Sequence, residues 1–532
     1  MVHDISDLVR TAANEVPDRR ALVESGGRSI TWAALEDEVG VVAGGLSGVG
    51  IRAGQRVMVA LGNRIEFVTS YLGVLRAQAV AVPVNPHASA EELAWMIADS
   101  GSRLVIADGS SLPAVRDAVT LLVSALEHGP MPGLDAETSA RGSRPVVVTV
   151  GVAPAPGEIS FADVHAAEAN AVPALPDPEK LAVLLYAATP SGPRAAMLSH
   201  RALLANLEQA AALGSDTMHG DDVVLGALPL FHVYGLNAVL GAVLHARSRL
   251  VLVEQWDPYA VLDLIEDEAC SVLPLAPTVF GHWLGADHLA ERLGPVRLVI
   301  SGSAVLDAAV IEEFSAPTGL EIQQGYGMTE AAPVVTSTLA SVVGRRGSVG
   351  APLTGVEVRI VDEGGHPTSG EDPGGIEIRG ANLFSGYWPH GADGPDDEGW
   401  WATGDVGWID VGGDLVVLDK VEEIITVSGF NVYPSEVEQA LGDVAGVKGV
   451  AVVAADDATT GHSVVAYVCA PGVDESVLRQ QVEEAAQARL ARFKRPARVE
   501  IVEELPRSTV TGGVHRGHLR GVERRRALEL LP

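Results

Sequence analysis

Short apolar runs alternate with helical patterns through the first part of the chain. Residues 56–61 and 79–83 have the character of buried strands, and the apolar positions at residues 65–75 recur at helical spacing. A second series with the same character covers residues 222–228, 249–253, 271–275 and 296–300. This alternation predicts α/β layers that are built on parallel strands.

The pattern changes farther along the chain. Residues 347–418 contain short strand-like runs separated by glycine-containing turns, which predicts a β-rich subdomain. Beyond residue 420, strand-like and helical segments form a compact α+β unit of about a hundred residues. We therefore predict a large N-terminal domain over residues 1–419 and a small C-terminal domain over residues 420–532, with the active site in the cleft between them.

Composition excludes several classes of protein. A chain of 532 residues exceeds the size at which one core keeps growing, so two or more domains are expected. The net charge of -32 argues against a nucleic-acid or anionic-membrane surface. The chain shows neither an apolar signal core nor a stretch that could span a membrane, and its two cysteines lie too far apart in sequence to suggest a disulfide framework. We expect a cytoplasmic protein whose partners are small molecules or proteins.

The segment YAATPSGPRAAMLSH, residues 186–200, has the surroundings of a phosphate-binding loop without its usual chemistry. The apolar run at residues 181–185 leads in like a buried strand, and Ser199 is placed to cap a helix that begins near Arg201. Backbone N–H groups between a strand and a helix can surround phosphate oxygens, but Gly192 is the only glycine here and the spacing GxxxxGK[ST] is absent. Taken alone, these residues favour an ordinary strand-to-helix connection.

Three other segments place useful side chains at turns. In QQGYGMTE, Tyr326 can stack on a purine, Thr329 can bond a phosphate and Glu330 can hold Mg²⁺. Asp405, in WATGD, suits the paired hydroxyls of a ribose, and His232, in FHVYG, sets an imidazole among apolar groups. Each residue alone has an ordinary alternative, such as a core aromatic, a solvated charge, a turn carboxylate or a hydrogen-bonded core histidine.

Together, the order and spacing of these segments resemble the superfamily of adenylate-forming enzymes, which includes acyl-CoA synthetases, adenylation domains of peptide synthetases and beetle luciferase. The resemblance covers nearly the whole chain. It includes SITWAAL at residues 29–35, VPVNP at 82–86, SGSAVL at 301–306, GSVGAP at 347–352 and SGFNVYPSEVE at 428–438. Within the superfamily, the pattern is most similar to fatty or aryl acyl-CoA ligases. It implies an α/β fold with a large, multi-subdomain N-terminal domain and a small mobile α+β domain.

The resemblance also implies an ATP-dependent reaction in two steps. A carboxylate attacks the α-phosphate of Mg-ATP to give an acyl-adenylate and pyrophosphate. The small domain then turns, and a thiol of CoA or of a carrier protein displaces AMP. Charge that develops on phosphorus is stabilised by Mg²⁺ and by a cation. The sequence leaves open whether the protein forms a homodimer.

Positions that match the superfamily's motifs take their expected roles from it. Tyr326 resembles the adenine-stacking aromatic, Thr329 the α-phosphate ligand and Glu330 the Mg²⁺ ligand. Asp405 resembles the ribose ligand, and His232 the residue beside the reacting carboxylate. The implied catalytic residues are His232, Thr329, Glu330 and Arg194. The implied nucleotide and cofactor residues are Ser191, Gly192, Ser303, Gly325, Tyr326, Gly327, Thr329, Asp405, Lys420 and Gly429, the last near the pantetheine arm of CoA.

The expected acyl pocket is made mostly of small or apolar residues. Its candidates are His232, Tyr234, Asn237, Leu240, Thr278, Ser303 and Gly325. Such a lining favours an apolar or aryl acid over a charged one.

The phosphate loop departs from the superfamily's pattern. Ala187 and Ala188 replace hydroxyl-bearing residues, Pro190 cannot donate an N–H, and Arg194 stands where the superfamily has Lys. Arg194 keeps the charge and could clamp a phosphate with two hydrogen bonds. By its place in the superfamily's pattern the segment is thus a phosphate loop, but its residues offer few groups that could bind a phosphate.

Two departures near the C-terminus also affect adenylation. Lys420 replaces the Arg that contacts ribose and phosphate, and Glu422 reverses a charge. Gly513 stands where the superfamily has the Lys that bridges the carboxylate and the α-phosphate. The chain contains only four lysines among its 37 basic residues. A shortage of lysine explains an Arg at that position, but it does not explain a Gly.

Three hypotheses follow. The first, which we favour, is an acyl-CoA ligase with a weakened first step, in which Arg516, Arg507 or His515 replaces the missing Lys. The second is an adenylate-forming scaffold adapted to another acceptor, to an oxyanion such as nitrite, or to a preformed acyl-adenylate. The third is a nucleotide- or acyl-binding pseudoenzyme with little turnover. Pyrophosphate release separates the first hypothesis from the third.

Overall fold

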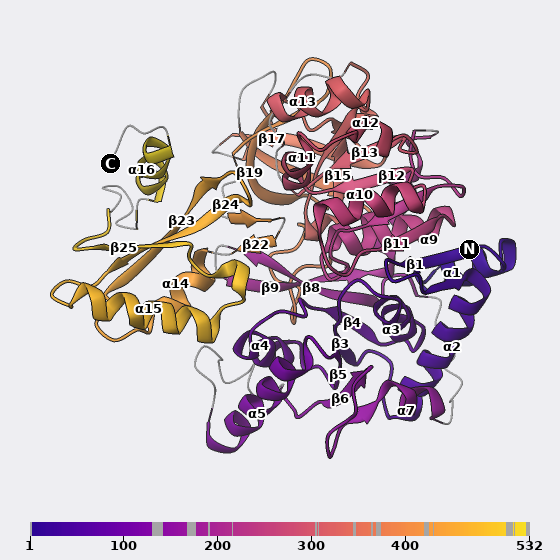
Figure 1. Cartoon of the computed structure of the whole chain (residues 1–532), viewed down its shortest axis with the longest axis horizontal. Coiled ribbons are helices and arrows are strands. Elements are labelled where there is room, and N and C mark those ends of the chain that lie inside the picture. Colours follow the sequence, from indigo (N-terminus) through magenta and orange to yellow (C-terminus); the bar gives the residue numbers. More distant parts are fainter. Residues whose placement is uncertain are drawn as a thin grey trace.

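The structure is a computed structural model with a large N-terminal and a small C-terminal domain (Figure 1). It describes residues 3–129, 142–167, 177–189, 192–214, 216–303, 306, 308–343, 347–362, 365–368, 374–419, 425–428, 430–432, 434–506, 514 and 516–527.

Two mainly parallel sheets form the centre of the large domain. The seven-stranded sheet has the order β7-β6-β5-β3-β4-β8-β9. Its strands are β3 (Arg56–Ala60), β4 (Val80–Pro83), β5 (Leu104–Asp108), β6 (Val146–Val150), β7 (Ile159–Ser160), β8 (Leu181–Thr189) and β9 (Gly192–Ser199). The nine-stranded sheet has the order β16-β15-β14-β13-β12-β10-β11-β1-β2. Its strands are β1 (Arg20–Glu24), β2 (Ser29–Thr31), β10 (Val223–Gly226), β11 (Arg249–Leu252), β12 (Val272–Leu275), β13 (Leu298–Ser301), β14 (Ile322–Gly327), β15 (Val334–Ser337) and β16 (Ala351–Pro352).

Alternate residues of one strand face different hydrophobic cores. In β3, Val57 and Val59 belong to a core that both large sheets share, whereas Met58 and Ala60 belong to a core that includes residues of α4 and α5. The shared core contains residues of α1 (Asp7–Glu15), α2 (Trp32–Gly48), α3 (Ile65–Arg76), α7 (Phe161–Ala166), α8 (His200–Ala211), the π-helical segment η1 (Tyr234–Gly241) and α9 (Ala242–Ala246). The outer layers are α4 (Ala90–Ser100) and α5 (Leu112–His128) on one sheet, and α10 (Pro258–Asp267), α11 (Pro277–Trp283), α12 (Leu289–Arg292) and α13 (Ala308–Thr318) on the other. The layered α/β architecture predicted from the apolar runs is therefore confirmed.

An antiparallel sheet follows the two parallel ones. It has the order β17-β18-β19-β20, with strands β17 (Val356–Val361), β18 (Gly374–Gly380), β19 (Trp401–Ile409) and β20 (Leu415–Asp419). Two short 3₁₀ turns, η2 (Thr329–Ala331) and η3 (Thr338–Ala340), flank β15. Ile376 and Ile378 of β18 pack in the same core as Tyr326 of β14, so this sheet is joined to the nine-stranded sheet.

The small domain is built on a five-stranded sheet of order β22-β21-β24-β23 with β25 paired to β24. Its elements are β21 (Ile425–Val427), β22 (Phe430–Val432), α14 (Pro434–Gly442), β23 (Gly449–Asp457), β24 (Gly461–Cys469), α15 (Glu475–Arg489), the 3₁₀ turn η4 (Arg492–Lys494), β25 (Arg498–Val502) and α16 (Arg516–Ala527). One core includes residues of α14 and α15, and another contains Leu519 of α16 with Val453 and Tyr467 of the sheet. The domain thus has apolar cores of its own, whereas the boundary at residues 419 and 420 stays a prediction.

The connection after β8 differs from the sequence prediction. The turn-rich segment expected between strand and helix is mostly a second strand, because β9 pairs antiparallel with β8 from Leu181 to Thr189. Ser199 ends β9 and caps α8, since its side chain accepts a hydrogen bond from the N–H of Ala202 at 3.2 Å. Pro190 and Ser191 lie outside the described residues.

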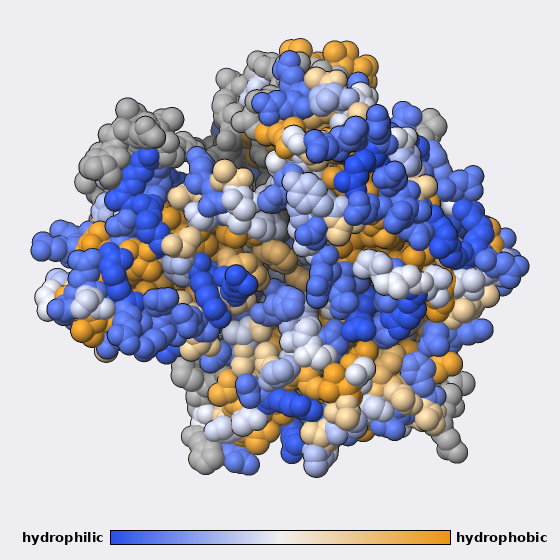
Figure 2. Space-filling model, in the orientation of Figure 1, coloured by the Kyte–Doolittle hydropathy of each residue, from blue (hydrophilic) through white to orange (hydrophobic). Residues whose placement is uncertain are grey.

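Hydrophilic residues cover much of both domains on the face seen in Figure 2. Within the part of the chain that the structure describes, no helix is both long and apolar enough to cross a membrane.

Candidate active site

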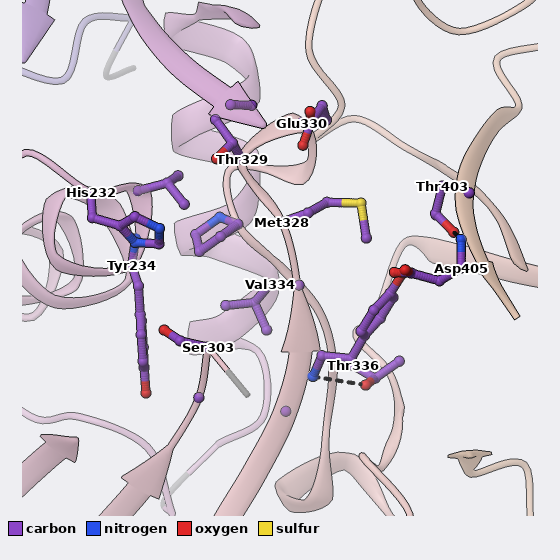
Figure 3. A pocket seen from close by; sticks show the side chains of 18 of the residues that line it. His232, Tyr234, Ser303, Met328, Thr329, Glu330, Val334, Thr336, Thr403 and Asp405 are labelled. Carbon is purple, nitrogen blue, oxygen red and sulfur yellow. Dashed lines mark hydrogen bonds between the residues drawn. The ribbon is translucent and has the colours of Figure 1, made fainter. Parts of the chain in front are cut away.

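A cavity of about 520 Å³ opens at the carboxyl ends of β13 and β14, where the β8–β9 hairpin and β19 approach these strands. Crevices at the carboxyl ends of parallel strands are the usual ligand sites of α/β sheets. Ten of the residues singled out from the sequence line this cavity: Arg194, His232, Tyr234, Ser303, Gly325, Tyr326, Gly327, Thr329, Glu330 and Asp405. Figure 3 shows His232, Tyr234 and Ser303 on one side and Thr403 and Asp405 on the other.

Tyr326 and Asp405 form a buried pair at one end of the cavity. The Tyr326 hydroxyl donates to Oδ2 of Asp405 at 2.5 Å, and the two residues are 7% and 6% exposed. Burial and the neighbouring Asp405 carboxylate both raise the pKa of Tyr326 well above its usual value, so the phenol stays protonated and keeps donating. This pair joins the nine-stranded sheet to the antiparallel sheet and presents an aromatic ring beside a carboxylate.

Glycine is required on β14 because the backbone of β15 approaches it closely. A Cβ atom at Gly325 would lie 2.7 Å from the carbonyl oxygen of Thr336, and one at Gly327 would lie 2.3 Å from that of Pro333. Both distances are shorter than a side-chain carbon tolerates, so the two glycines let the β14–β15 hairpin close around Tyr326. The hydroxyl of Thr336 then accepts a hydrogen bond from the N–H of Tyr326 at 3.3 Å (Figure 3).

Glu330 is the first of a series of side chains that contact one another along the cavity wall. Its Oε1 accepts a hydrogen bond from the Tyr387 hydroxyl at 2.6 Å, and the residue is 6% exposed. The guanidinium of Arg194 lies 4.1 Å from the centre of the Tyr387 ring and binds Oδ2 of Asp393 at 2.6 Å. Arg194 is therefore already paired with a carboxylate at the position where a phosphate would have to bind.

His232, Tyr234 and Ser303 form the opposite wall. Tyr234 begins the π-helical segment η1, a type of helix distortion that occurs often at functional sites. Nδ1 of His232 accepts a hydrogen bond from the N–H of Tyr234 at 3.4 Å. Ser303 has a φ of 76°, a left-handed conformation that costs a non-glycine residue about 1–3 kcal/mol and is concentrated at functional sites.

The side chain of Tyr234 limits the depth of this part of the cavity. A Cβ atom at Gly302 would lie 2.7 Å from a ring carbon of Tyr234, so the ring lies directly against the end of β13. The buried Tyr234 hydroxyl has no hydrogen-bond partner among the described residues, and burial raises its pKa above the usual value. Packing alone therefore holds this ring in place.

Three of the expected pocket residues do not line the cavity. Asn237 is buried, and its amide donates to the carbonyl oxygens of Leu203 at 3.1 Å and Ala332 at 2.6 Å, which ties η1 to neighbouring segments. Leu240 belongs to the core that the two large sheets share. Thr278 instead lies beside the small domain, because its methyl group would be 3.1 Å from a Cβ atom at Gly461.

Several expected nucleotide residues are outside the cavity lining or the described part of the chain. Gly192 pairs with Thr189 at the end of the β8–β9 hairpin. Ser191, Lys420, Gly429 and Gly513 lie outside the described residues, so their expected roles stay predictions. Of the residues proposed to replace the missing Lys, Arg507 and His515 also lie outside them. Arg516 lies on α16 and binds both carboxylate oxygens of Glu438, at 2.9 Å and 2.7 Å.

Sequence reasoning missed Tyr387, Asp393 and Thr336. All three line the cavity, and each contacts a residue that had been predicted. The segment NLFSGYW, which contains Tyr387, ends in a Gly and two aromatics and could have drawn attention. Asp393 and Thr336 stand in segments without a comparable signal.

Comparisons with known proteins cover nearly the whole chain. A family model described as "AMP-binding enzyme" matches residues 9–388, and one described as "AMP-binding enzyme C-terminal domain" matches residues 436–512. A long-chain-fatty-acid–CoA ligase of Bacillus subtilis is 29% identical over 95% of this chain and 92% of its own length. A 4-coumarate–CoA ligase of rice, Oryza sativa subsp. japonica, is 30% identical over 95% of this chain and 90% of its own.

Solved structures resemble the whole chain. Apo MatB from Rhodopseudomonas palustris is 31% identical with a TM-score of 0.68, and the match covers 97% of this chain and 98% of MatB. The amide bond synthetase McbA from Marinactinospora thermotolerans is 25% identical with a TM-score of 0.80, over 98% of this chain and 99% of McbA.

Proposed function

Because the chain belongs to the family of AMP-binding enzymes, we propose that it is an AMP-forming acid–thiol ligase that converts a carboxylic acid into its CoA thioester through an acyl-adenylate. The observation that carries this proposal is the single cavity in which the Tyr326–Asp405 pair lies opposite His232 and Tyr234. One end suits a nucleoside and the other a carboxylate with its acyl group.

The nucleoside end is assigned to Tyr326, Asp405 and Thr329. The ring of Tyr326 provides a face for the adenine base, and the Asp405 carboxylate accepts hydrogen bonds from the ribose hydroxyls. The Thr329 hydroxyl is placed in the cavity next to Glu330, where it can donate to the α-phosphate. Tyr326 also fixes Asp405 before the ligand arrives, so ordering this carboxylate costs little on binding.

The residues present fit a Mg²⁺ ion that is held together with phosphates. Among the described residues, no three His, Cys, Asp or Glu side chains group together as a metal site. Mg²⁺ is usually bound by one or two carboxylates and by substrate phosphates, so Glu330 at the cavity wall is sufficient. The ion would supply positive charge beside the α-phosphate, and Tyr387 orients the carboxylate of Glu330.

The acyl end favours a compact acid. His232 is placed to contact the reacting carboxylate, and the Tyr234 ring closes the space behind it against Gly302. Residues farther along η1, such as Leu236 and Leu240, are buried in the core. Arg194 is the only Lys or Arg side chain among the described residues that line the cavity, and Asp393 neutralises it. We infer that the substrate is an aryl or short apolar acid.

The thiol approaches from the small domain. Phe430 of β22 stacks on Phe231, next to His232, with ring centres 6.3 Å apart. A groove of about 1340 Å³ between α4, α5 and the small domain includes Ser428, Phe430, Arg492 and Arg495 in its lining. These arginines suit the phosphates of CoA, and a carrier-protein thiol would use the same entrance.

The adenylation step is proposed to be weak. Ala187 lines the cavity without a hydroxyl, and Arg194 must leave Asp393 to clamp a phosphate. The position of the bridging lysine holds Gly513. The direct test is to supply acids with ATP and CoA, and to follow pyrophosphate and acyl-CoA separately. Formation of neither product from any aryl, short or long acid would contradict the proposed function.

Asp405→Ala is expected to weaken AMP binding by about ten- to a hundredfold. The substitution removes charge-assisted hydrogen bonds to the ribose, which are worth about 1.5–3 kcal/mol, and it leaves the Tyr326 hydroxyl without its acceptor. Calorimetric titration with AMP measures the change. Asp397→Ala is the matched control, because it removes an exposed carboxylate that does not line the cavity. Unchanged AMP affinity in Asp405→Ala would remove the ribose assignment.

Tyr234→Ala is expected to shift the preference toward longer acids. Removing the ring opens space between η1 and Gly302, and each methylene group buried there gains about 0.8 kcal/mol, or about fourfold in affinity. The measurement is kcat/KM over a series of acids of increasing length. Leu240→Ala is the control, because it shortens a core residue that does not line the cavity. A length preference that does not change would show that another residue sets the depth.

A further inference from the structure

A buried cluster of three charged side chains lies between the two domains. The ammonium group of Lys494, in η4, is 2.5 Å from Oε1 of Glu92 in α4. The same ammonium is 2.8 Å and 3.0 Å from the two carboxylate oxygens of Glu436 in α14. The three side chains are only 12–13% exposed. One lysine of the small domain thus joins a carboxylate of each domain.

Glu92 is held in place by its own helix. Its Oε2 accepts a hydrogen bond from the N–H of Ser89, which caps α4, at 2.8 Å, and the Ser89 hydroxyl accepts from the N–H of Glu92. The Ser89 hydroxyl also donates to the carbonyl oxygen of Arg489 in the small domain at 2.9 Å. The start of α4 is therefore a rigid docking point, and a second contact between the domains lies beside the ion cluster.

The cluster is connected to the entrance of the cavity by aromatic rings. Phe493, adjacent to Lys494, packs on Phe430 with ring centres 4.7 Å apart, and Phe430 stacks on Phe231. Phe231 precedes His232, which lines the cavity. The ions therefore fix the position of β22, where the incoming thiol is proposed to pass. The C-terminal helix α16 lies on the far side of the small domain (Figure 1).

We propose that Glu92, Glu436 and Lys494 are positioning residues that hold the small domain in the arrangement for acyl transfer to the thiol, an inference that rests on the proposed function. When the domain turns for adenylation, Lys494 and Glu436 leave Glu92. The cluster therefore acts on the second step of the reaction and not on the first.

The charges of the cluster make docking of the small domain depend on pH. The two buried carboxylates share one ammonium group. Burial and the neighbouring Glu92 raise the pKa of Glu436 to about 8, and Lys494 opposes this shift. The pKa of Glu92 is lowered by Lys494 despite its burial. Glu436 thus binds a proton in the docked state and releases it when the domain turns and exposes it. The contribution of this proton to docking is full in acid, falls as the pH rises from the usual range of a carboxyl group to about 8, and is gone above it.

Lys494→Met tests the positioning role. Without the ammonium, the buried charge of Glu92 has no cation beside it, so transfer of a supplied acyl-adenylate to CoA is expected to slow by about tenfold or more. Pyrophosphate release from acid and ATP is expected to stay within about twofold, because that step does not use this contact. Arg479→Met is the matched control, since it removes a cation of the same domain from an exposed pair with Glu475. Equal losses in both steps for Lys494→Met would overturn the proposal.

Two isosteric variants provide a test that simple destabilisation does not reproduce. Glu436→Gln imitates the protonated carboxyl, so transfer is expected to keep its rate at neutral pH and to lose the decline that the natural protein shows as the pH rises toward about 8. Glu92→Gln removes the charge that pairs with Lys494, so transfer is expected to fall at neutral pH. A decline toward pH 8 that persists in both variants, or a transfer rate that is unchanged in Glu92→Gln, would contradict the assignment.

A structural readout separates failure of this inference from failure of the proposed function. Small-angle scattering of the natural protein and of Lys494→Met, without substrates, reports the domain arrangement directly. A more extended average shape for Lys494→Met supports the inference even if no acid is turned over. Identical scattering by the two proteins would overturn it, whatever their activity.

Discussion

Replacing Gly513 by Lys is expected to raise pyrophosphate release by about a hundredfold or more. In other enzymes, a charged or polar group placed where negative charge develops stabilises the transition state by about 3–4 kcal/mol, which corresponds to two to three powers of ten in rate. The superfamily's bridging lysine stands at this position in the resemblance, and glycine supplies only its backbone N–H. The measurement is pyrophosphate release from an aryl acid and ATP, run beside consumption of a supplied acyl-adenylate.

The expected gain is specific to one step and one position. In the arrangement described here, the neighbouring Val514 packs against the small domain's own core, and Arg516 is bound to Glu438. In the resemblance, the lysine at this position serves adenylation, so transfer to CoA is expected to change little. Gly512→Lys is the control, because it adds the same charge one residue away.

Rapid pyrophosphate release by the natural protein would contradict this prediction. Another cation would then perform the lysine's task, and Arg516→Met would test the first candidate. Because Arg516 must give up its two contacts with Glu438 to reach the cavity, a strong loss in Arg516→Met would also require a large rearrangement.

The layers of the large domain could be predicted because buried parallel strands leave a simple signal. Runs such as residues 56–61 and 249–253 are apolar on both faces, and the structure places them as β3 and β11 between two helical layers. The small domain could also be predicted as an α+β unit, and the structure forms β23 to β25 and the helix α15 there.

The β8–β9 hairpin could not be read in the same way. The sequence favoured an ordinary strand-to-helix connection over residues 186–200, yet β9 pairs with β8 along its length. Turn-forming residues describe local preference only, whereas pairing with a neighbouring strand is a tertiary effect that overrides it.

Only part of the candidate site could be predicted from the sequence. Tyr326 and Asp405 are 79 positions apart, and their contact depends on how the antiparallel sheet packs on β14. Asn237 has the polarity of a pocket residue, but its amide satisfies two buried carbonyl groups instead. The type of a side chain alone does not show whether it lines a pocket or bonds buried backbone groups.

Glu330→Gln is expected to lower pyrophosphate release by about a hundred- to a thousandfold. The substitution keeps an oxygen that can accept from the Tyr387 hydroxyl but removes the charge that would hold Mg²⁺ beside the phosphates. Measuring the rate against Mg²⁺ concentration is expected to show a higher requirement for the ion. Transfer of a supplied acyl-adenylate to CoA needs no new phosphate chemistry, so it is expected to stay within about threefold.

Tyr387→Phe separates the charge of Glu330 from its orientation. This variant keeps the carboxylate and the ring beneath Arg194 and removes only the hydroxyl that donates at 2.6 Å. Losing one hydrogen bond to a charged group costs about 1.5–3 kcal/mol at most, and water can replace part of it, so a loss of about tenfold is expected. If Glu330→Gln and Tyr387→Phe lower pyrophosphate release equally, Glu330 acts through the wall of the cavity and not as the metal ligand. If Glu330→Gln slows both steps equally, its role lies in the shape of the site rather than in adenylation.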